Sequence, residues 1–99
     1  MQIKRTKENG VTVLSVIGQL VSPTSPSFEA AINSVLDEEN QLILDFAQVD
    51  FLASSGIRVL LTTHKKIRAS MGALILRNVN DVVMNVLETT GLKDFLDIR

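Results

Sequence analysis

Two runs, Gln41-Leu-Ile-Leu-Asp-Phe46 and Ser54-Ser-Gly-Ile57, decide the fold class of this chain. The first run is almost wholly apolar, which predicts a short strand buried in a sheet. Residues 47–52 are expected to form a loop that leads to the second run. The residues after that run have the spacing of one helical face, which comprises Ile57, Leu60, Leu61, His64 and Ile67. The two runs therefore predict a buried strand, a loop and an amphipathic helix, which Gly72 is expected to end.

The alternation of strand and helix continues toward the C-terminus. Residues 73–76, Ala-Leu-Ile-Leu, predict another short buried strand. Asn80 or Asp81 then caps a further helix, whose inward positions are Val83, Val86 and Leu87. Gly91 fits the position just after this helix in a Schellman ending. The apolar residues within 95–98 predict either a last helical turn or an edge strand.

The N-terminal part predicts a hairpin followed by a helix. Glu8-Asn9-Gly10 contains the strongest short hairpin signal, because both central residues of a type I′ turn need a positive φ. The run Val11–Ile17 is too apolar for a strand with one exposed face, so we expect it to be covered on both faces and ended by Gly18. Ser25-Pro26, or Ser22-Pro23, fits the start of a helix. The apolar stripe of that helix is Phe28, Ala31, Ile32, Val35 and Leu36.

These elements predict one α/β domain over residues 1–99. The sheet is expected to be mixed and four- to five-stranded, with an N-terminal hairpin and with amphipathic helices packed on it. The chain has 99 residues, of which 45% are hydrophobic and 21% are charged, a balance typical of a folded globular protein rather than of disorder. The sequence contains no internal repeat and no sign of a second domain.

The composition excludes several classes of chemistry. With no Cys and one His, the chain has no residues for a disulfide, a thiolate zinc site or a histidine metal cluster, and we expect neither a metal nor a cofactor. A net charge of −1 and four aromatic residues, all Phe, argue against nucleic acid as a partner. No apolar run approaches the roughly 20 residues that cross a bilayer. We therefore expect a cytoplasmic protein without a membrane partner.

Individual polar residues suggest little catalysis. His64 lies on or beside the apolar face of its helix and has no second His or Ser-Asp pairing in view, so we assign it no role. Asp45 lies at a predicted strand end, where it either lines a functional edge or caps a loop. The helix after residue 54 also has a basic side, which is either a solvated face or a docking surface. Its residues are Arg58, Lys65, Lys66 and Arg68.

Ser54-Ser55-Gly56 is the most informative segment of the chain. Either serine can cap the helix through its hydroxyl, and Gly56 leaves the backbone open to close approach by another molecule. A helix N-terminus also offers unpaired N–H groups and the positive end of the helix dipole, so the fold tolerates a phosphate there. The residues alone fit both an ordinary helix cap and a phosphorylation switch.

Several segments, taken in order and spacing, resemble the STAS domain of bacterial anti-sigma factor antagonists. These segments are GQL at 18–20, LILDF at 42–46, VDFL at 49–52, SSGI at 54–57, VLL at 59–61 and VLETTGL at 86–92. The most specific part is the strand with Asp45, followed by a short loop and Ser-Ser-Gly-Ile. The resemblance covers nearly the whole chain and leads us to expect a stand-alone antagonist rather than the cytosolic tail of an anion transporter.

The resemblance implies an interaction protein and not an enzyme. In this family the unphosphorylated antagonist binds an anti-sigma factor that is also a serine kinase, which frees the sigma factor. Serine phosphorylation ends that binding, and a serine phosphatase restores it. Carried onto this chain, the phosphorylated residue is Ser55, with Ser54 as the second choice, and the protein is expected to be a monomer or a weak dimer. The implied partner-binding residues are Val21, Ser22, Leu52, Ala53, Ser54, Ser55, Gly56, Arg58 and Thr62.

Two positions depart from the family pattern. Ala53 stands where members usually carry Asp before the serine pair, and Val21 stands where Asp commonly follows Gly-x-Leu. These replacements favour an alternative: an accessory or ligand-binding STAS module, such as a lipid-transport subunit or a nucleotide sensor, in which Ser55 only caps the helix. An enzyme is not favoured, because the sequence positions no catalytic base and contains no cofactor loop.

Overall fold

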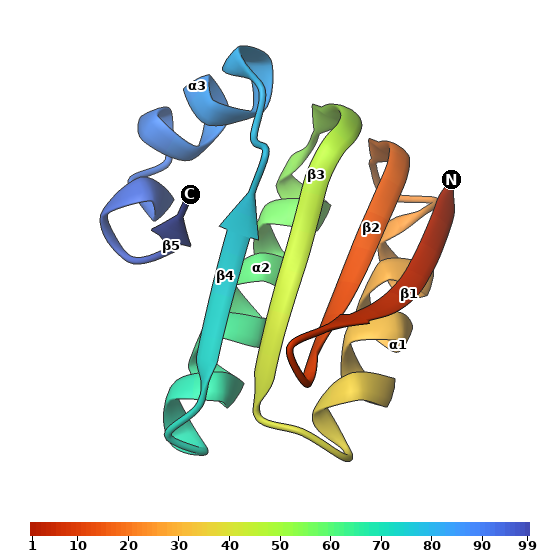
Figure 1. Cartoon of the computed structure of the whole chain (residues 1–99). Coiled ribbons are helices and arrows are strands. Elements are labelled where there is room, and N and C mark those ends of the chain that lie inside the picture. The colour runs from red at the N-terminus through yellow and green to blue at the C-terminus, as the bar shows by residue number, and fades with distance from the viewer.

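The N-terminal hairpin forms as the Asn-Gly pair predicts (Figure 1). The structure is a computed structural model that describes residues 1–99. Strands β1 (Gln2–Glu8) and β2 (Val11–Leu20) pair antiparallel along the whole of β1. Asn9 and Gly10 between them have φ angles of 52° and 83°, the positive values that a type I′ turn requires. The predicted hairpin is confirmed.

Three further strands complete a five-stranded sheet in the order β1-β2-β3-β4-β5. They are β3 (Gln41–Leu52), β4 (Ala73–Arg77) and β5 (Asp97–Ile98). Strands β2 to β5 run parallel to one another and β1 runs antiparallel to β2, so the predicted mixed sheet is confirmed. Because parallel strands end at the same edge, the segments that follow β2 and β3 begin side by side.

Helices α1 (Ser25–Leu36) and α2 (Ser54–Ala69) lie together behind the sheet in Figure 1. Helix α3 (Asp81–Thr89) lies beyond the end of β4, and a short 3-10 helix, η1 (Leu92–Asp94), leads from it into β5. None of these helices combines the length and the apolar character needed to span a membrane. The connections place α1 and α2 next to each other with their N-terminal ends at the same edge of the sheet.

The hydrophobic core fills the space between the sheet and these two helices. The apolar stripe predicted for α1 faces the core, where Phe28, Ile32 and Val35 are buried and the other two members are partly buried. The Phe28 ring meets Phe46 of β3 with the ring centroids 6.2 Å apart. Burying a large apolar side chain contributes about 1.5–3 kcal/mol, so this layer supplies most of the favourable free energy of folding. The residues that form it from both sides include Leu14, Phe28, Ile32, Leu42, Leu44, Phe46, Leu60 and Leu76.

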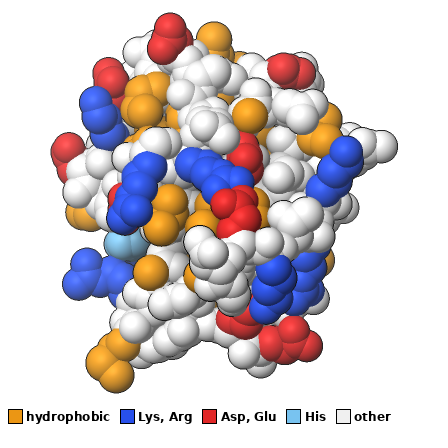
Figure 2. Space-filling view, in the orientation of Figure 1, with side chains coloured by type: hydrophobic (Ala, Val, Ile, Leu, Met, Phe, Trp, Pro, Cys, Tyr) orange, Lys and Arg blue, Asp and Glu red, His pale blue; other side chains and the backbone are white.

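A charged cluster lies on the opposite face of the sheet, in the middle of the view in Figure 2. Arg77 of β4 pairs with Glu8 of the hairpin and places its Nε 3.2 Å from Oδ2 of Asp45. Asp45 also accepts hydrogen bonds from the Ala47 N–H and from the Asn78 amide. Burial is the largest influence and raises the pKa of Asp45, but the bonds from Ala47, Asn78 and Arg77 together lower it below the usual value. Asp45 therefore joins β3 to β4 and lines no hollow.

Two strands extend beyond their predicted ends. Strand β2 passes through Gly18, which has a φ of 117° at an irregularity in the pairing with β3, so the prediction that Gly18 ends the strand was wrong. Residues 47–52 were expected to be a loop, but β3 continues to Leu52, which pairs with Leu20 of β2. A bulge at a glycine bends the chain without ending the ladder, and an apolar-pattern argument does not detect it.

Helix boundaries differ from prediction by about a turn or less. The N-cap of α1 is Thr24, so Ser25 is the first helical residue and not the cap. The cap of α3 is confirmed, because Asn80 accepts a backbone N–H of the first turn at 2.9 Å. Gly91 has a φ of 80° directly after α3, as the Schellman ending predicts. Of the two alternatives for residues 95–98, the edge strand forms, as β5 at Asp97–Ile98, and the 3-10 turn lies before this region at Leu92–Asp94.

Helix α2 ends at Ala69, before the predicted stop at Gly72. Met71 rather than Gly72 takes the left-handed conformation that closes the helix, with a φ of 56°. Gly72 is needed for a different reason: a Cβ at this position would lie 1.8 Å from the carbonyl oxygen of Asn40. The turn after α2 therefore packs directly on the backbone that leads into β3.

Candidate functional site

The segments that follow β2 and β3 meet at the carboxyl edge of the sheet. The Ala53 N–H donates to the Leu20 carbonyl oxygen at 2.8 Å, which ties the start of α2 to the end of β2. Gly56 makes this approach feasible, since a Cβ there would lie 3.0 Å from Cβ of Leu20 and 2.7 Å from Cδ1 of Leu52. Glycine at position 56 is therefore explained by close packing of α2 on the neighbouring segment.

Residues 21–24, between β2 and α1, form a turn closed by hydrogen bonds among themselves, to Gln19 and to Ser25 at the start of α1. The Val21 N–H donates to Oγ1 of Thr24 at 3.0 Å, and the Thr24 hydroxyl lies 2.7 Å from the carbonyl oxygen of Gln19. The Val21 carbonyl oxygen accepts from the backbone N–H groups of Thr24 and Ser25 at 3.0 and 2.9 Å. The turn therefore holds its side chains in fixed positions beside α2.

Ser25 and Ser55 join the two segments through their hydroxyls. Their Oγ atoms lie 3.0 Å apart, and Oγ of Ser25 lies 2.8 Å from the Val21 carbonyl oxygen. A hydroxyl has one proton and a carbonyl oxygen can only accept, so Ser25 donates to Val21 and accepts from Ser55. The Ser55 hydroxyl is thus bonded to Ser25 and not to a backbone N–H of its own helix. The N-cap of α2 is Ala53 without a side-chain cap, so the prediction that Ser54 or Ser55 caps the helix was wrong.

Ser55 borders a hollow of about 270 Å³ between α1 and α2. The first turn of α2 contains no acidic residue, and Arg58 reaches the hollow one turn after Ser55. The helix N-terminus adds the positive end of its dipole. Glu29 of α1 is the one carboxylate on the hollow's wall, whose residues are Ser22, Ser25, Pro26, Glu29, Ser55, Arg58 and Val59. The hollow is small, and most of the residues that line it are polar.

The predicted partner-binding residues are brought together here, with different exposure. Leu52 and Gly56 are buried and support the site from below. The other residues reach the surface: Ser22, Ser54 and Arg58 are exposed, and Val21, Ala53, Ser55 and Thr62 are half-buried. Leu52 and Gly56 therefore hold α2 in place and have little surface for contact with another protein.

Ser25 and Glu29 are the site residues that sequence reasoning missed. Ser25 was interpreted as a helix cap, and Glu29 as a residue off the apolar stripe of its helix. Strand order places the ends of β2 and β3 side by side, but it does not say which hydroxyls meet there. The only sequence feature that pointed to this contact was a serine in each of the two segments that follow β2 and β3.

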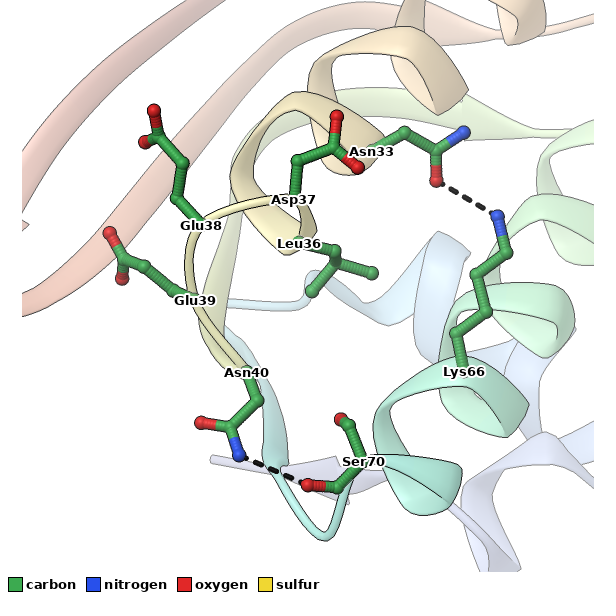
Figure 3. Close-up of a pocket in the computed structure, with 8 residues that line it drawn as sticks. All are labelled: Asn33, Leu36, Asp37, Glu38, Glu39, Asn40, Lys66 and Ser70. Atoms are coloured by element: carbon green, nitrogen blue, oxygen red, sulfur yellow. Dashed lines mark hydrogen bonds between the residues drawn. The ribbon is translucent and has the colours of Figure 1, made fainter.

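A larger hollow, of about 730 Å³, lies at the other end of the α1–α2 pair (Figure 3). Lys66 donates to Oδ1 of Asn33 at 3.0 Å across it. Glu38 and Glu39 point away from Lys66 and pair with basic residues of β1. The chain nowhere gathers three His, Asp or Glu side chains that could hold a metal ion. This hollow therefore shows no arrangement suited to chemistry, and Ser55 remains the centre of the candidate site.

Comparisons with known proteins agree on one family. The family model of the STAS domain matches residues 2–99. Over 64 residues the chain is 39% identical to the anti-sigma-F factor antagonist RsfB of Mycobacterium tuberculosis, a match that covers 64% of this chain and 52% of RsfB. The crystal structure of an anti-sigma factor antagonist from Mycobacterium paratuberculosis superimposes with a TM-score of 0.84 at 28% identity, covering 98% of this chain and 83% of that one.

The Bacillus protein SpoIIAA shares the fold in both of its solved forms. Its unphosphorylated form gives a TM-score of 0.82 at 21% identity and covers 99% of this chain and 88% of its own. Its phosphorylated form gives 0.75 at 20% identity and covers 99% and 91%. The resemblance noted in the sequence is thereby confirmed. The chain belongs to the STAS domain family, among the anti-sigma factor antagonists.

Proposed function

We propose that this chain is a partner-switching regulator that binds an anti-sigma factor with serine kinase activity. In its unphosphorylated form it would hold that factor and so free a sigma factor. Phosphorylation of Ser55 ends the binding, and a serine phosphatase restores it. Ser54 is the second choice for the phosphorylated residue, because it is the neighbouring exposed serine.

The observation that carries this proposal is the setting of the Ser55 hydroxyl. It borders an open hollow at the N-terminus of α2 and is hydrogen-bonded to Ser25, which lies on the wall of the same hollow. The oxygen can therefore be approached from solvent. A phosphate on it would meet the positive end of the helix dipole and the guanidinium of Arg58, so the folded chain tolerates the modified residue.

The charge arithmetic explains how one phosphate ends binding. The chain has a net charge of −1, and a phosphate adds about −1.5 to −2 at neutral pH. Burying such a charge unpaired against a partner costs several kcal/mol, and about 1.4 kcal/mol changes affinity tenfold. The complex is lost without any refolding of the chain.

The relatives support the same kind of partner. RsfB is named as an antagonist of an anti-sigma-F factor, and SpoIIAA is an anti-sigma factor antagonist that has been solved in a phosphorylated form. On this chain the docking surface would combine the turn at Val21 and Ser22, the segment from Ala53 to Ser55, and the outward residues Arg58 and Thr62 of α2. Leu52 and Gly56 would support this surface from beneath.

A second candidate function rests on the two missing acids. Val21 and Ala53 lie beside Ser55 where the family pattern has Asp, so no carboxylate from these positions can orient the hydroxyl or meet a kinase nucleotide site. An accessory or ligand-binding STAS module, for example in a lipid-transport complex or as a nucleotide sensor, needs neither acid. In that case Ser55 would be unmodified and the chain would bind its partner independently of ATP.

The decisive experiment uses the anti-sigma serine kinases encoded in the genome that encodes this chain. Each purified kinase is incubated with the chain, Mg²⁺ and ATP, and the intact mass of the chain is measured. Binding is measured in parallel by calorimetry with ADP in place of ATP. We expect one kinase to bind the chain and to add a single phosphate, which peptide sequencing assigns to Ser55.

Three variants separate the alternatives. Ser55→Ala is expected to bind the kinase and to gain no phosphate, and Ser55→Asp is expected to lose binding. Ser54→Ala serves as the matched control and should behave like the wild type. If no kinase modifies the chain and Ser55→Asp binds as tightly as the wild type, the switch is excluded and the accessory module is favoured.

A further inference from the structure

Helix α2 carries a concentrated positive charge on a chain that is slightly acidic overall. The chain has 11 acidic and 10 basic residues, yet Ser54–Ala69 contains no Asp or Glu. Its four basic side chains are Arg58, Lys65, Lys66 and Arg68. Such a separation of charge on one helix is not needed for packing, because the buried face of α2 is apolar or small.

None of these four cations has an acidic partner within the chain. Each of the six ion pairs uses a basic residue outside α2. Lys66 donates to Asn33, whereas Arg58, Lys65 and Arg68 make no side-chain hydrogen bond. Each residue of a helix is rotated by about 100° from the one before it, so positions 58, 65 and 68 fall on the same outward side of α2. The outward side of α2 is therefore a row of uncompensated positive charges.

Exposed apolar side chains adjoin this row at its C-terminal half. Phe95, after η1, is 65% exposed, and Leu61 of α2 is 36% exposed. The Phe95 ring stands beside His64 with the ring centroids 6.3 Å apart. Leu61, His64, Lys65, Arg68 and Phe95 together line a hollow of about 470 Å³. We call these five residues the α2–Phe95 surface; its edge is visible beside the pale blue histidine in Figure 2.

An apolar hollow rimmed by unpaired cations fits a protein segment better than other anionic ligands. A lipid surface needs a helix whose apolar face points outward, but the apolar face of α2 packs on the sheet. Duplex binding uses about 6–10 phosphate contacts, more than this short row can make. A hollow, in contrast, accepts one protruding side chain while the surrounding cations meet carboxylates.

We propose that the α2–Phe95 surface is a docking site for an acidic segment of a partner protein, one that inserts a large apolar side chain between Leu61 and Phe95. This site is separate from the one around Ser55. Residues 55 and 65 are about 15 Å apart along the helix, at 1.5 Å per residue. The Debye length at physiological ionic strength is about 8 Å, so a phosphate on Ser55 leaves this docking site almost unaffected.

The test is a peptide selection on the full chain. A random peptide library is selected on the wild type and depleted on the double variant Arg68→Glu/Phe95→Ser, which leaves only peptides that need the α2–Phe95 surface. We expect the survivors to combine several Asp or Glu with one Phe, Leu or Trp. Titration of one such peptide into the isotope-labelled chain should shift the amide signals of Leu61, Lys65 and Phe95.

Single variants then assign the contribution of each part. Phe95→Ser and Arg68→Glu, each confirmed as folded by its thermal transition, should weaken the peptide by about tenfold or more. Lys4→Glu makes the same charge change at an exposed residue of β1, and Val82→Ser removes an exposed apolar side chain of α3, which is 57% exposed. Neither control should change the affinity, and Ser55→Asp should leave it within about twofold of the wild type because of the screening distance.

Several results would overturn the proposal. One is a selection that yields no peptide dependent on Phe95 and Arg68, or that yields neutral or basic peptides. Another is tighter binding of phosphatidylglycerol vesicles or of single-stranded oligothymidine to the same residues. Concentration-dependent self-association of the chain that Phe95→Ser abolishes would assign the surface to a second copy instead. Because none of these measurements uses a kinase, their failure is distinct from a failure of the switch at Ser55.

Discussion

The hydroxyl oxygens of Ser25 and Ser55 lie 3.0 Å apart, where the N-terminal ends of α1 and α2 meet. Ser25 is only 5% exposed, and its own proton goes to the Val21 carbonyl oxygen. Ser55 therefore donates to a fixed acceptor rather than rotating freely. The orientation of the serine that the proposed switch uses thus depends on the position of the first turn of α1.

We predict that Ser25→Ala uncouples Ser55 from α1 at a small cost in stability. A net hydrogen bond contributes about 0.5–1.5 kcal/mol, so the free energy of unfolding should fall by about 1 kcal/mol. Urea unfolding of the wild type, Ser25→Ala, Ser55→Ala and the double variant measures the pairwise coupling, which we expect to be of the same size. In a kinase assay Ser25→Ala should change the rate of phosphorylation while leaving binding intact.

Ser27→Ala is the matched control for this cycle, since Ser27 is an exposed serine of the same helix and makes no side-chain hydrogen bond. It should leave the unfolding free energy within about 0.5 kcal/mol of the wild type. If the effects of Ser25→Ala and Ser55→Ala simply add, the two hydroxyls do not interact and the orientation argument fails.

We predict that Gly56→Ala destabilises the chain although alanine favours helices. A new Cβ would lie 2.7 Å from Cδ1 of Leu52 and 3.0 Å from Cβ of Leu20, and Leu52 and Leu20 are both buried and cannot move away freely. Overpacking of this kind costs about 1–3 kcal/mol, which exceeds the roughly 0.5–1 kcal/mol gained by replacing glycine in a helix. Thermal unfolding followed by circular dichroism checks the direction.

The same change in a Leu52→Val background tests the stated cause. Valine is shorter and removes the Cδ1 atom that the added methyl group meets first, so the penalty of Gly56→Ala should shrink. An unchanged penalty would assign the cost to Leu20 alone, and a gain in stability in the wild-type background would contradict the packing argument.

Patterns along the chain predicted the elements better than their junctions. The Asn9-Gly10 turn, the apolar stripe of α1 and the Asn80 cap each depend on neighbours within a few residues, and the structure confirms them. The continuation of β2 through Gly18 depends instead on pairing with a strand that follows much later in the chain. Local reasoning treats such a glycine as an end, because the compensating ladder bonds are not visible in the sequence.

In the candidate site, too, the local feature was predicted and the long-range contact was not. Ser54-Ser55-Gly56 was identifiable because it stands before a predicted helix and matches a family motif. The partner of Ser55 was not, because Ser25 lies 30 residues away and its helical position was predicted from a local cap pattern. Only the parallel pairing that ends at Leu20 and Leu52 brings these two serines together.

We predict that acid weakens the fold through three carboxyl groups. The hydrogen bond from Arg77 lowers the pKa of Glu8, hydrogen bonds from Lys7 and Thr12 lower the pKa of Glu39, and the pKa of Asp45 is also lowered despite its burial. A lowered pKa in the folded state means that stability is fully present above the unfolded-state pKa and is lost as the pH falls through the folded-state pKa. Urea unfolding should therefore show a loss of stability below about pH 4.5.

Arg77→Met isolates part of this effect, because it removes the shared partner of Glu8 and Asp45. Its unfolding free energy should depend less steeply on pH in the acid range than that of the wild type. Lys4→Met, which removes one exposed positive charge that has no acidic partner, controls for the change in net charge. An equally steep acid dependence in Arg77→Met would mean that the cluster on the open face of the sheet does not contribute.

We predict that Asn80 stabilises α3 through two separable bonds. Its Oδ1 accepts the Val83 N–H at 2.9 Å, and its Nδ2 donates to the Val49 carbonyl oxygen at 2.7 Å, so it both caps α3 and fastens it to β3. Asn80→Ala should cost about 1–2 kcal/mol in urea unfolding. Asn80→Ser keeps a capping oxygen but has no group that reaches Val49, so it should recover only part of that loss.

Asn85→Ala, on the exposed side of the same helix, should be nearly neutral. If Asn80→Ser is no more stable than Asn80→Ala, the cap contributes nothing and the bond to Val49 alone holds the helix in place.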